Sequence, residues 1–153
     1  MLVRALLAFL ALPGVVAFAV PLGWALSTER ARLAQPLGLV PLLLGIAGLF
    51  WCVRDFYVAG KGTLAPWSPP KRLVVVGLYR YSRNPMYVSV LLILIGWAVC
   101  FEMRGLVIYA VIVAIAFHVR VVTGEEPWLA RTHSAQWDAY KARVPRWFGI
   151  TSC

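Results

Sequence analysis

Two short polar segments, each next to an apolar run, carry the side chains whose types and spacing suit chemistry. In the first, residues 77–87 (GLYRYSRNPMY), Asn84 is a favourable helix N-cap and Pro85 a favourable first helical residue, so a helix is predicted to begin there. The free backbone N–H groups of its first turn form a partial positive charge, and Arg83 adds a full one. This junction is therefore suited to bind an anion.

The second segment is the pair Glu125-Glu126, at the end of an apolar run where cations are more usual at a membrane surface. Helix-start electrostatics is one explanation, since Thr123 or Gly124 could precede a helix whose first turn holds both glutamates. That accounts for one glutamate better than for two, so the pair indicates a bound partner. The first segment has an alternative too, because its tyrosines and arginines are typical of anchors at the level of lipid headgroups.

The elements that must position these segments are apolar helices. The 153 residues are 61% hydrophobic and 14% charged, which indicates an integral membrane protein. A helix needs roughly 20 apolar residues to cross the hydrocarbon core, so there is room for about four crossings. The uncharged runs predict an all-α membrane protein of one domain, residues 1–153, with spans at about 5–28, 33–53, 84–101 and 105–122. The short connection 102–104 predicts a tight antiparallel hairpin between the last two spans.

The first predicted span also resembles a secretory signal peptide, with Arg4, an apolar core and the small-residue pattern of residues 17–19. A retained span is the preferred interpretation, because the apolar run continues to Leu26 and a signal core has roughly 7 to 15 residues. Whether residues 1–26 are ever cleaved stays open at this point.

The orientation follows from the cations. Twelve of the 15 lysines and arginines flank the spans on one side, and Arg30, Arg32 and Arg104 lie on the other. By the positive-inside rule both termini and the loop 54–83 are predicted to be cytoplasmic. This topology and anionic lipid headgroups explain the net charge of +9, so no nucleic-acid partner is indicated.

A C-terminal amphipathic helix is predicted at 125–143, where it either lies on the membrane or closes over the site. Its apolar face is formed by Leu129, His133, Trp137, Tyr140 and Val144. His118, two helical turns before Glu125 and on the same face, is a further ligand candidate.

Other residues are predicted to have packing roles. Cys52 and Cys100 show no spacing that suggests a metal site or a disulfide framework, so we interpret them as packing residues and expect no metal. Gly45, Ala47 and Gly48 are small enough to let the second span approach a neighbouring helix closely.

Together these motifs resemble the isoprenylcysteine carboxyl methyltransferase family, which is grouped with the phospholipid methyltransferases. The residues that carry the resemblance lie in order along the chain: GLYR at 77–80, RNPMY at 83–87, Glu125-Glu126, and the ending Tyr140 with Val144-Pro145-Arg146. The segment 60–80 is similar to the bacterial branch, which implies a bacterial inner membrane. The resemblance covers about residues 54–148, and the first two spans match only in character.

The resemblance implies an S-adenosylmethionine-dependent methyltransferase, with the cofactor bound on the cytoplasmic side and a lipophilic or lipidated substrate entering from the bilayer. Arg83 and Glu126 are the implied catalytic residues. The expected cofactor-binding residues are Tyr79, Arg83, Asn84, Pro85, Tyr87, His118, Glu125 and Glu126. Two positions depart from the family pattern: Asn84 stands where many members have His, which weakens any imidazole role, and Ser89 stands where many have Gly.

The chemistry of this cofactor agrees with the residues. Its carboxylate suits Arg83 and the helix start, its ammonium and ribose diol suit the glutamates, and its sulfonium suits aromatic faces. Methyl transfer needs mainly alignment and exclusion of water, so neither a triad nor a metal is required. A carboxylate acceptor needs no general base, whereas an amine or thiol would be helped by Glu126, His118 or His133. The sequence leaves the acceptor and the oligomeric state open.

Two rival interpretations are retained. A membrane sterol-type reductase carries a similar Arg-x-Pro-x-Tyr segment and binds NADPH, although the glutamate pair would repel its phosphates. A non-enzymatic four-span scaffold or transporter subunit is the other rival. The polar residues cluster on one side and charge is lacking at mid-membrane depth, and neither feature fits a transport path.

Overall fold

The computed structural model describes residues 10–29, 31–59 and 73–148, and these contain helices and connecting segments but no strand. The helices in chain order are η1 (Leu10–Ala19), α2 (Val20–Ser27), η2 (Pro36–Gly38), α3 (Leu39–Val58), η3 (Gly77–Arg80), α4 (Pro85–Cys100), α5 (Arg104–Arg120), η4 (Val121–Glu125) and α6 (Glu126–Arg143). The predicted all-α class is confirmed.

An apolar helix occupies the middle of each predicted span: η1 with α2, then α3, α4 and α5. Two helices, Pro36–Val58 and Arg104–Arg143, are long and apolar enough to cross a membrane. The other two apolar helices, Pro13–Ser27 and Pro85–Cys100, are shorter. Four crossings therefore remain a prediction, whereas two candidate membrane-spanning helices are present.

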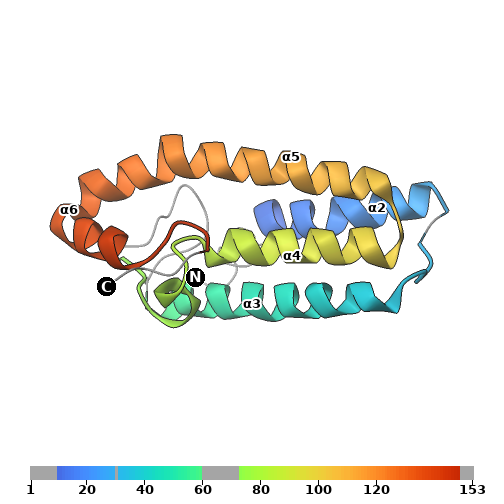
Figure 1. Ribbon diagram of the computed structural model, residues 1–153, viewed down its shortest axis with the longest axis horizontal. Helices are drawn as coiled ribbons and strands as arrows, with labels where there is room; N and C mark the ends of the chain where they lie inside the picture. Colours follow the sequence, from blue (N-terminus) through green and yellow to red (C-terminus); the bar gives the residue numbers. More distant parts are fainter. Residues whose placement is uncertain (1–9, 30, 60–72, 149–153) are drawn as a thin grey trace.

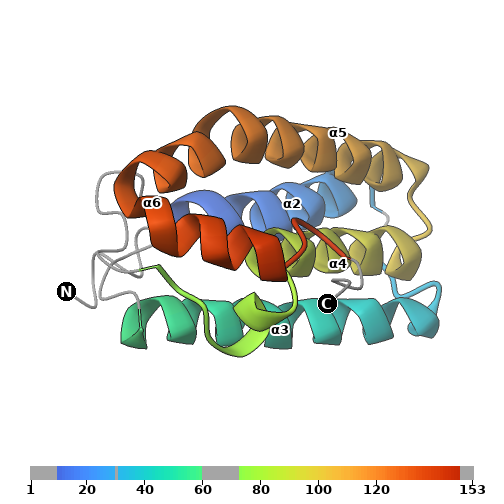
Figure 2. The same cartoon turned by 60° about the vertical axis from the view of Figure 1, so that its left-hand side comes forward.

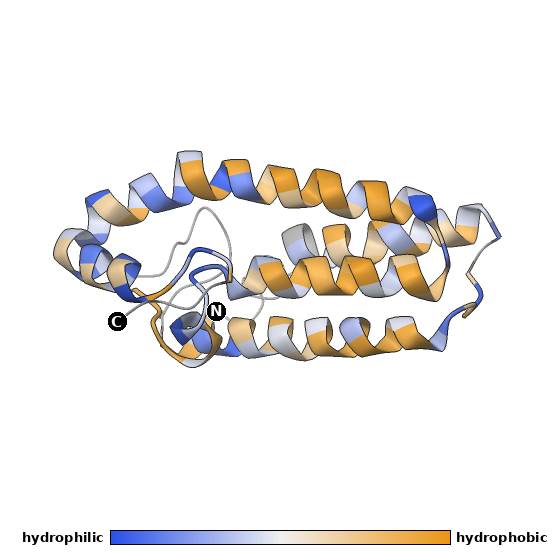
Figure 3. Ribbon diagram, in the orientation of Figure 1, coloured by the Kyte–Doolittle hydropathy of each residue, from blue (hydrophilic) through white to orange (hydrophobic). Residues whose placement is uncertain are grey.

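The two long helices expose most of their apolar side chains. Only 28% and 22% of their most apolar windows are buried inside the protein, whereas the core helix of a soluble protein is mostly buried. Exposed apolar residues include Val40, Leu43 and Leu44 on α3 and Ile108, Ile112 and Ile115 on α5. Hydrophobic residues dominate α3 and α5 in Figure 3, whereas α6 is largely hydrophilic. So much exposed apolar surface is typical of a face in contact with lipid.

The helix Arg104–Arg143 is 40 residues long, about twice the roughly 20 residues of one crossing. Its apolar first part, α5, is the candidate span, and η4 and α6 continue beyond it. The backbone of Ser134 is non-helical, so α6 bends there and crosses one end of the bundle (Figure 2). The helix predicted at 125–143 thus coincides with α6 (Glu126–Arg143).

Helices α3 and α4 lie side by side along the long axis, with α5 on the other side of α4 (Figure 1). Glycines bring α3 and α4 close together. A methyl group at Gly96 would lie 2.6 Å from the Leu42 Cβ atom, and one at Gly45 would lie 2.7 Å from the Ser89 carbonyl oxygen. Small residues at a helix interface allow such an approach in membranes.

The predicted packing roles of the small residues are partly confirmed. Gly45 and Gly48 both face Ser89, but Ala47 is exposed, so its part of the prediction is wrong. Cys100 belongs to the main core cluster, and Cys52 packs with Val74 and Tyr79. Both cysteines are buried, in agreement with their predicted packing role.

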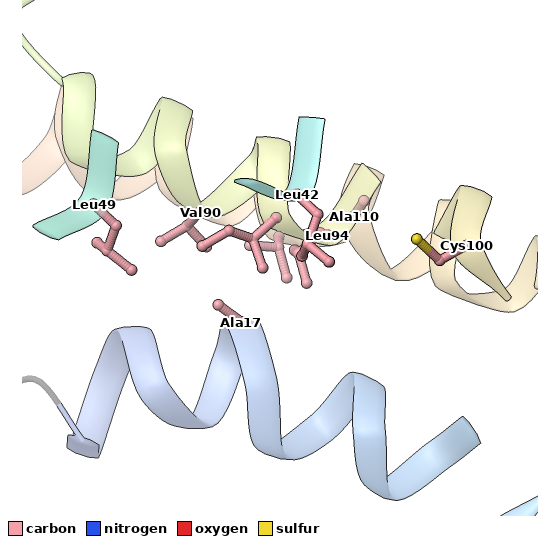
Figure 4. Close-up of a cluster of buried hydrophobic side chains, with 9 residues drawn as sticks. Ala17, Leu42, Leu49, Val90, Leu94, Cys100 and Ala110 are labelled. Carbon is pink, nitrogen blue, oxygen red and sulfur yellow. The ribbon is translucent and has the colours of Figure 1, made fainter. Parts of the chain in front are cut away.

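The main core lies where η1, α3, α4 and α5 meet (Figure 4). Its members are all apolar, and Leu49, Ile93 and Leu94 are among the largest fully buried side chains. Two partly buried aromatic side chains nearby donate to the first helix: Trp97 Nε1 to the Ala17 carbonyl at 3.0 Å and the Tyr109 hydroxyl to the Val16 carbonyl at 3.2 Å. The first apolar helix is therefore fixed to the bundle by hydrogen bonds as well as by packing.

The predicted hairpin between the last two spans is present. Helix α4 ends at Cys100 and α5 begins at Arg104. Glu102 adopts a positive φ of 51°, and the Met103 N–H donates to the Ala98 carbonyl at 3.1 Å. The turn thus satisfies backbone groups at the end of α4.

Candidate functional site

A pocket lies at the end of the bundle where α3 ends, α4 begins and α6 crosses (Figure 1). Its space, open mouth included, is about 630 Å³. Apolar, aromatic and charged side chains share the wall. They are Phe56, Leu73, Val74, Tyr79, Arg83, Asn84, Met86, Tyr87, Glu125, Glu126, Leu129, Trp137 and Tyr140.

Glu126, the first residue of α6, is held by two arginines. Arg146 donates from Nε to Oε1 at 2.9 Å and from Nη2 to Oε2 at 2.7 Å. Arg83 approaches the same carboxylate from the other side, with Nη1 3.0 Å from Oε1, as an ion pair whose angles are not those of a hydrogen bond. The Arg83 guanidinium also lies 5.3 Å from the centroid of the Trp137 ring, in cation–π range.

Two arginines and one carboxylate leave this part of the pocket with an excess of one positive charge. Burial alone raises the pKa of Glu126, but hydrogen bonds from Arg146 and the charges of Arg83, Arg146 and Lys141 outweigh it and hold the pKa below its ordinary value. Glu126 is therefore ionised at neutral pH. Only 10% of the Arg83 side chain is exposed, and its Nε has no hydrogen-bond partner. A buried guanidinium donor without a partner, at the wall of a pocket, favours an anionic ligand.

Glu125 belongs to a separate network. The Tyr87 hydroxyl donates to Glu125 Oε1, and Arg120 Nε donates to the same oxygen at 2.9 Å and to the Tyr87 hydroxyl oxygen at 3.2 Å. The Tyr87 ring also packs on Phe117, with centroids 4.3 Å apart. The π-turn η4 joins α5 to α6 at this point, and the two adjacent glutamates serve different arginines. Single π-turns of this kind are frequent at functional sites.

The start of α4 is held by the segment that follows α6. Helix α4 begins at Pro85 as predicted, but the Asn84 side chain does not cap it, which corrects the proposed role of this residue. Asn84 Nδ2 donates instead to the Arg146 carbonyl at 3.1 Å, and the Asn84 N–H donates to Ser82 Oγ at 3.1 Å. The Arg83 N–H donates to the Pro145 carbonyl at 2.9 Å. Contacts with the tail therefore take the place of a local cap.

Two tyrosines form the aromatic part of the wall. The Tyr140 hydroxyl donates to the Tyr79 carbonyl at 2.7 Å, and the Tyr79 ring lies 5.5 Å from that of Phe56, centroid to centroid. Burial raises the pKa of both phenols. Both hydroxyls are thus protonated at neutral pH, so they serve as donors and ring faces rather than as bases.

Most of the predicted site residues meet in this pocket. Tyr79, Arg83, Asn84, Tyr87, Glu125 and Glu126 all contribute to its wall. Pro85 is buried at the start of α4 and does not contribute to the wall. His118 lies outside the wall, exposed on α5, where its Nδ1 accepts a hydrogen bond from Trp147 Nε1 at 3.2 Å. His133 is also outside the wall, with its ring against Trp128.

Several wall residues were not among the predicted ligands. Trp137 and Tyr140 are predicted as part of the apolar face of the C-terminal helix, and Tyr140 also belongs to the motifs that carry the family resemblance. Phe56 and Met86 resemble any other apolar residue of the spans, so nothing in the sequence singles them out. No spacing rule links Arg146 to Glu126, because the loop after α6 makes the contact.

A family model described as phospholipid methyltransferase matches residues 33–136, which is more than half of the chain. No curated protein and no solved structure matches the chain. The match includes the wall residues Arg83, Tyr87, Glu125 and Glu126 of the two polar networks, but not Arg146. The resemblance drawn from the sequence motifs is therefore confirmed. The helical fold and the two apolar helices that could cross a membrane agree with this match. The chain belongs to the phospholipid methyltransferase family.

Proposed function

We propose that this chain is an S-adenosylmethionine-dependent methyltransferase that acts on a lipophilic acceptor at the cytoplasmic face of a membrane. The observation that carries the proposal is the nine-tenths buried Arg83 side chain, whose Nε is unpartnered at the wall of a pocket that also holds carboxylates and aromatic rings. Membership of a methyltransferase family supports the same activity.

The pocket residues fit the groups of this cofactor. The Arg83 guanidinium would bind its carboxylate, for which the unpartnered Nε is a ready donor. Glu126 and Glu125 keep acceptor capacity beside their arginine contacts, and they would bind the ammonium and the ribose hydroxyls. The ring faces of Tyr79, Trp137 and Tyr140 would lie near the sulfonium, which they stabilise by cation–π attraction.

S-adenosylmethionine supplies an electrophilic methyl group bound to a sulfonium sulfur. The protein's own contribution is to orient the two reactants and to exclude water from the reacting centre. The pocket suits that task, because its rings and apolar side chains surround a few fixed charged groups.

The chemistry of the wall supports an acceptor that is nucleophilic without loss of a proton, such as a carboxylate. Glu125 and Glu126 are each paired with arginine, and burial keeps the phenols of Tyr79 and Tyr140 protonated. No pocket residue in the described part of the chain is therefore suited to remove a proton from an amine or a thiol near neutral pH. The apolar part of the wall, with Phe56, Leu73, Val74, Met86 and Leu129, suits a lipophilic body.

The cytoplasmic location rests on the distribution of cations. Arg83 and Arg146 lie at the pocket, and both belong to the side on which the positive-inside rule places most lysines and arginines of the sequence. The alternative of an NADPH-dependent reductase is less well supported, because Glu125 and Glu126 would face the phosphates of that ligand.

The experiment uses S-adenosylmethionine with a labelled methyl group and the protein in nanodiscs. Acceptors are offered in four classes: a prenylated cysteine, a fatty acid, phosphatidylethanolamine and a lipophilic thiol. We expect label in the organic phase with a carboxylate acceptor, loss of it in Arg83→Ala, and its retention in the control Arg80→Ala, whose side chain is exposed. Absence of label with every acceptor, or equal transfer by Arg83→Ala, contradicts the proposal.

A further inference from the structure

The segment after α6 contains an arginine that does not contribute to the pocket wall but contacts two residues that do. We propose that Arg146 is a positioning residue for the cofactor: its guanidinium holds the Glu126 carboxylate, and its backbone carbonyl holds the Asn84 side chain. The proposal rests on the proposed function. Arg146 lies beyond residues 33–136, the part of the chain that matches the family.

The side-chain contact has the geometry of a planar fork. Both oxygens of Glu126 are bound by separate nitrogens of Arg146, at 2.9 Å and 2.7 Å. Paired parallel hydrogen bonds of this kind fix the orientation of a carboxylate as well as its charge. A lysine would keep the charge but lose the fork. The rotamer of Glu126 at the pocket wall is thus set by a residue 20 positions further along the chain.

The fork also determines what Arg83 can do. Because Arg146 binds both oxygens of Glu126, Arg83 is left with one ion pair through Nη1 and with an unpartnered Nε. Without the Arg146 side chain, Arg83 could form the fork with Glu126 itself. Arg83 and Glu126 would then occupy each other's hydrogen-bonding groups, which would no longer be available to the ligand. The pocket would also lose its excess positive charge. Arg146 therefore keeps Arg83 available for an anion.

The backbone of the segment is anchored independently of the Arg146 side chain. The Arg146 carbonyl accepts hydrogen bonds from Asn84 Nδ2 at 3.1 Å and Ser82 Oγ at 3.3 Å, and the Pro145 carbonyl accepts one from the Arg83 N–H at 2.9 Å. Val144 is buried against Trp137 and Tyr140. Substitution of the Arg146 side chain leaves all these contacts in place, so the variants should keep the fold.

The first test is the affinity for S-adenosylhomocysteine, measured by calorimetry on the full chain in nanodiscs at pH 7. We expect Arg146→Ala to bind at least tenfold more weakly, and Arg146→Lys to lie between it and wild type. The matched control is Arg143→Ala, since Arg143 is exposed on α6 and its Nε donates to the Ala139 carbonyl of the same helix at 3.3 Å. Circular dichroism and thermal unfolding verify the fold of each variant.

The second readout is the pH dependence of the affinity, which a merely structural role would not move. The charged groups around Glu126 are Arg83 beside α4, Arg146 in the tail and Lys141 on α6, with Glu125 and Tyr87 in the adjoining network. Loss of Arg146 removes hydrogen bonds that lower the pKa of Glu126. The acid limb of binding should therefore shift to higher pH in Arg146→Ala. Titration of the ligand's own groups is common to all variants and cancels in the comparison.

The outcomes distinguish a failure of the positioning role from a failure of the proposed function. If wild type binds and Arg146→Ala binds equally well with an unshifted acid limb, the positioning role is overturned and the proposed function stands. If wild type binds neither S-adenosylmethionine nor its product, the proposed function is overturned, and the positioning role with it. If Arg146→Ala does not fold, Arg146→Lys decides: weaker binding supports the role, and wild-type affinity and pH profile overturn it.

Discussion

Arg83 Nη1 lies 3.0 Å from Glu126 Oε1. This ion pair connects the segment just before α4 to the first residue of α6. The contact brings together two sequence motifs that are 43 positions apart. It lies at the wall of the pocket, where the Arg83 guanidinium also contacts the ring of Trp137. The two motifs are thus parts of one site.

Removal of either partner should abolish cofactor binding without unfolding the protein. Glu126→Gln leaves two arginines without their counter-charge, and Arg83→Ala removes the guanidinium that the proposed ligand carboxylate needs. We expect at least a tenfold loss of affinity in each, equivalent to about 1.4 kcal/mol or more. Calorimetry with S-adenosylhomocysteine measures the loss, and Arg143→Ala, at an exposed position on α6, is the control. Wild-type affinity in both folded variants would mean that the site is elsewhere.

The hydroxyl of Tyr87 should stabilise the junction of α4 with η4. Tyr87→Phe removes the donor to Glu125 and a contact with Arg120 but keeps the ring against Phe117. We expect a loss of about 1 kcal/mol in the free energy of unfolding, typical of one hydrogen bond. Denaturant titration in detergent measures it. Tyr57→Phe, at an exposed position on α3, should have no effect.

Gly77 should tolerate no side chain. Its φ is +57°, and a Cβ atom there would overlap Asp55 Oδ2 and lie 2.8 Å from Trp51 Nε1. Gly77→Ala should therefore lower the free energy of unfolding by about 2 kcal/mol or more, from backbone strain and overlap together.

A double-mutant cycle separates these two causes. In an Asp55→Ala background the overlap with the carboxylate is absent, and only the strain of the positive φ and the close contact with Trp51 Nε1 remain. Gly77→Ala should then cost less than in wild type. An equal cost in both backgrounds would show that the carboxylate contributes nothing to the constraint.

The hairpin between α4 and α5 offers a stabilising substitution. Glu102 has a positive φ of 51°, which glycine adopts without strain. Glu102→Gly is expected to raise the free energy of unfolding by about 0.5–1 kcal/mol, visible as a higher Tm in detergent. Glu102→Ala is the matched control, because alanine suffers the same strain as glutamate. A gain with alanine equal to that with glycine would assign the effect to the charge instead.

The stability of the protein should depend on pH through Glu126. Its pKa is lower in the folded protein than in the unfolded chain, so the folded state binds fewer protons in the acid range. The stabilisation is therefore present above the unfolded pKa of about 4.5 and is lost as the pH falls through the lower folded value. Thermal unfolding of Glu126→Gln should show a flatter acid limb than that of wild type. An unchanged acid limb would show that other carboxylates cause the loss of stability at low pH.

The sequence predicted the helices well because each depends on local patterns. Uncharged runs located η1 with α2, α3, α4 and α5, and Pro85 marked the first residue of α4. Apolar periodicity found α6 and the face on which Trp137 and Tyr140 are buried. Local propensity also misled at one place. Asn84 has the residue type of an N-cap, but its side chain binds the Arg146 carbonyl, a contact 62 positions away that no local rule includes.

The sequence predicted the pairing of the polar residues less well than it predicted the helices. Residue types alone pointed to Arg83, Tyr87, Glu125 and Glu126, since charges beside apolar helices are costly without partners. Which arginine serves which glutamate depends on the π-turn η4 and on the path of the chain after Val144. The same tertiary detail sets His118 against Trp147 rather than in the pocket wall. The prediction that His118 is a ligand rested on helix periodicity, which does not include this contact with Trp147.

The most direct test of the account is a calorimetric titration of the wild-type protein in nanodiscs with S-adenosylmethionine, S-adenosylhomocysteine and NADPH. The account predicts one site per chain for each of the first two ligands and none for NADPH. Binding of NADPH alone would contradict it and assign the pocket to a reductase. Binding of none of the three would leave the pocket without the proposed cofactor.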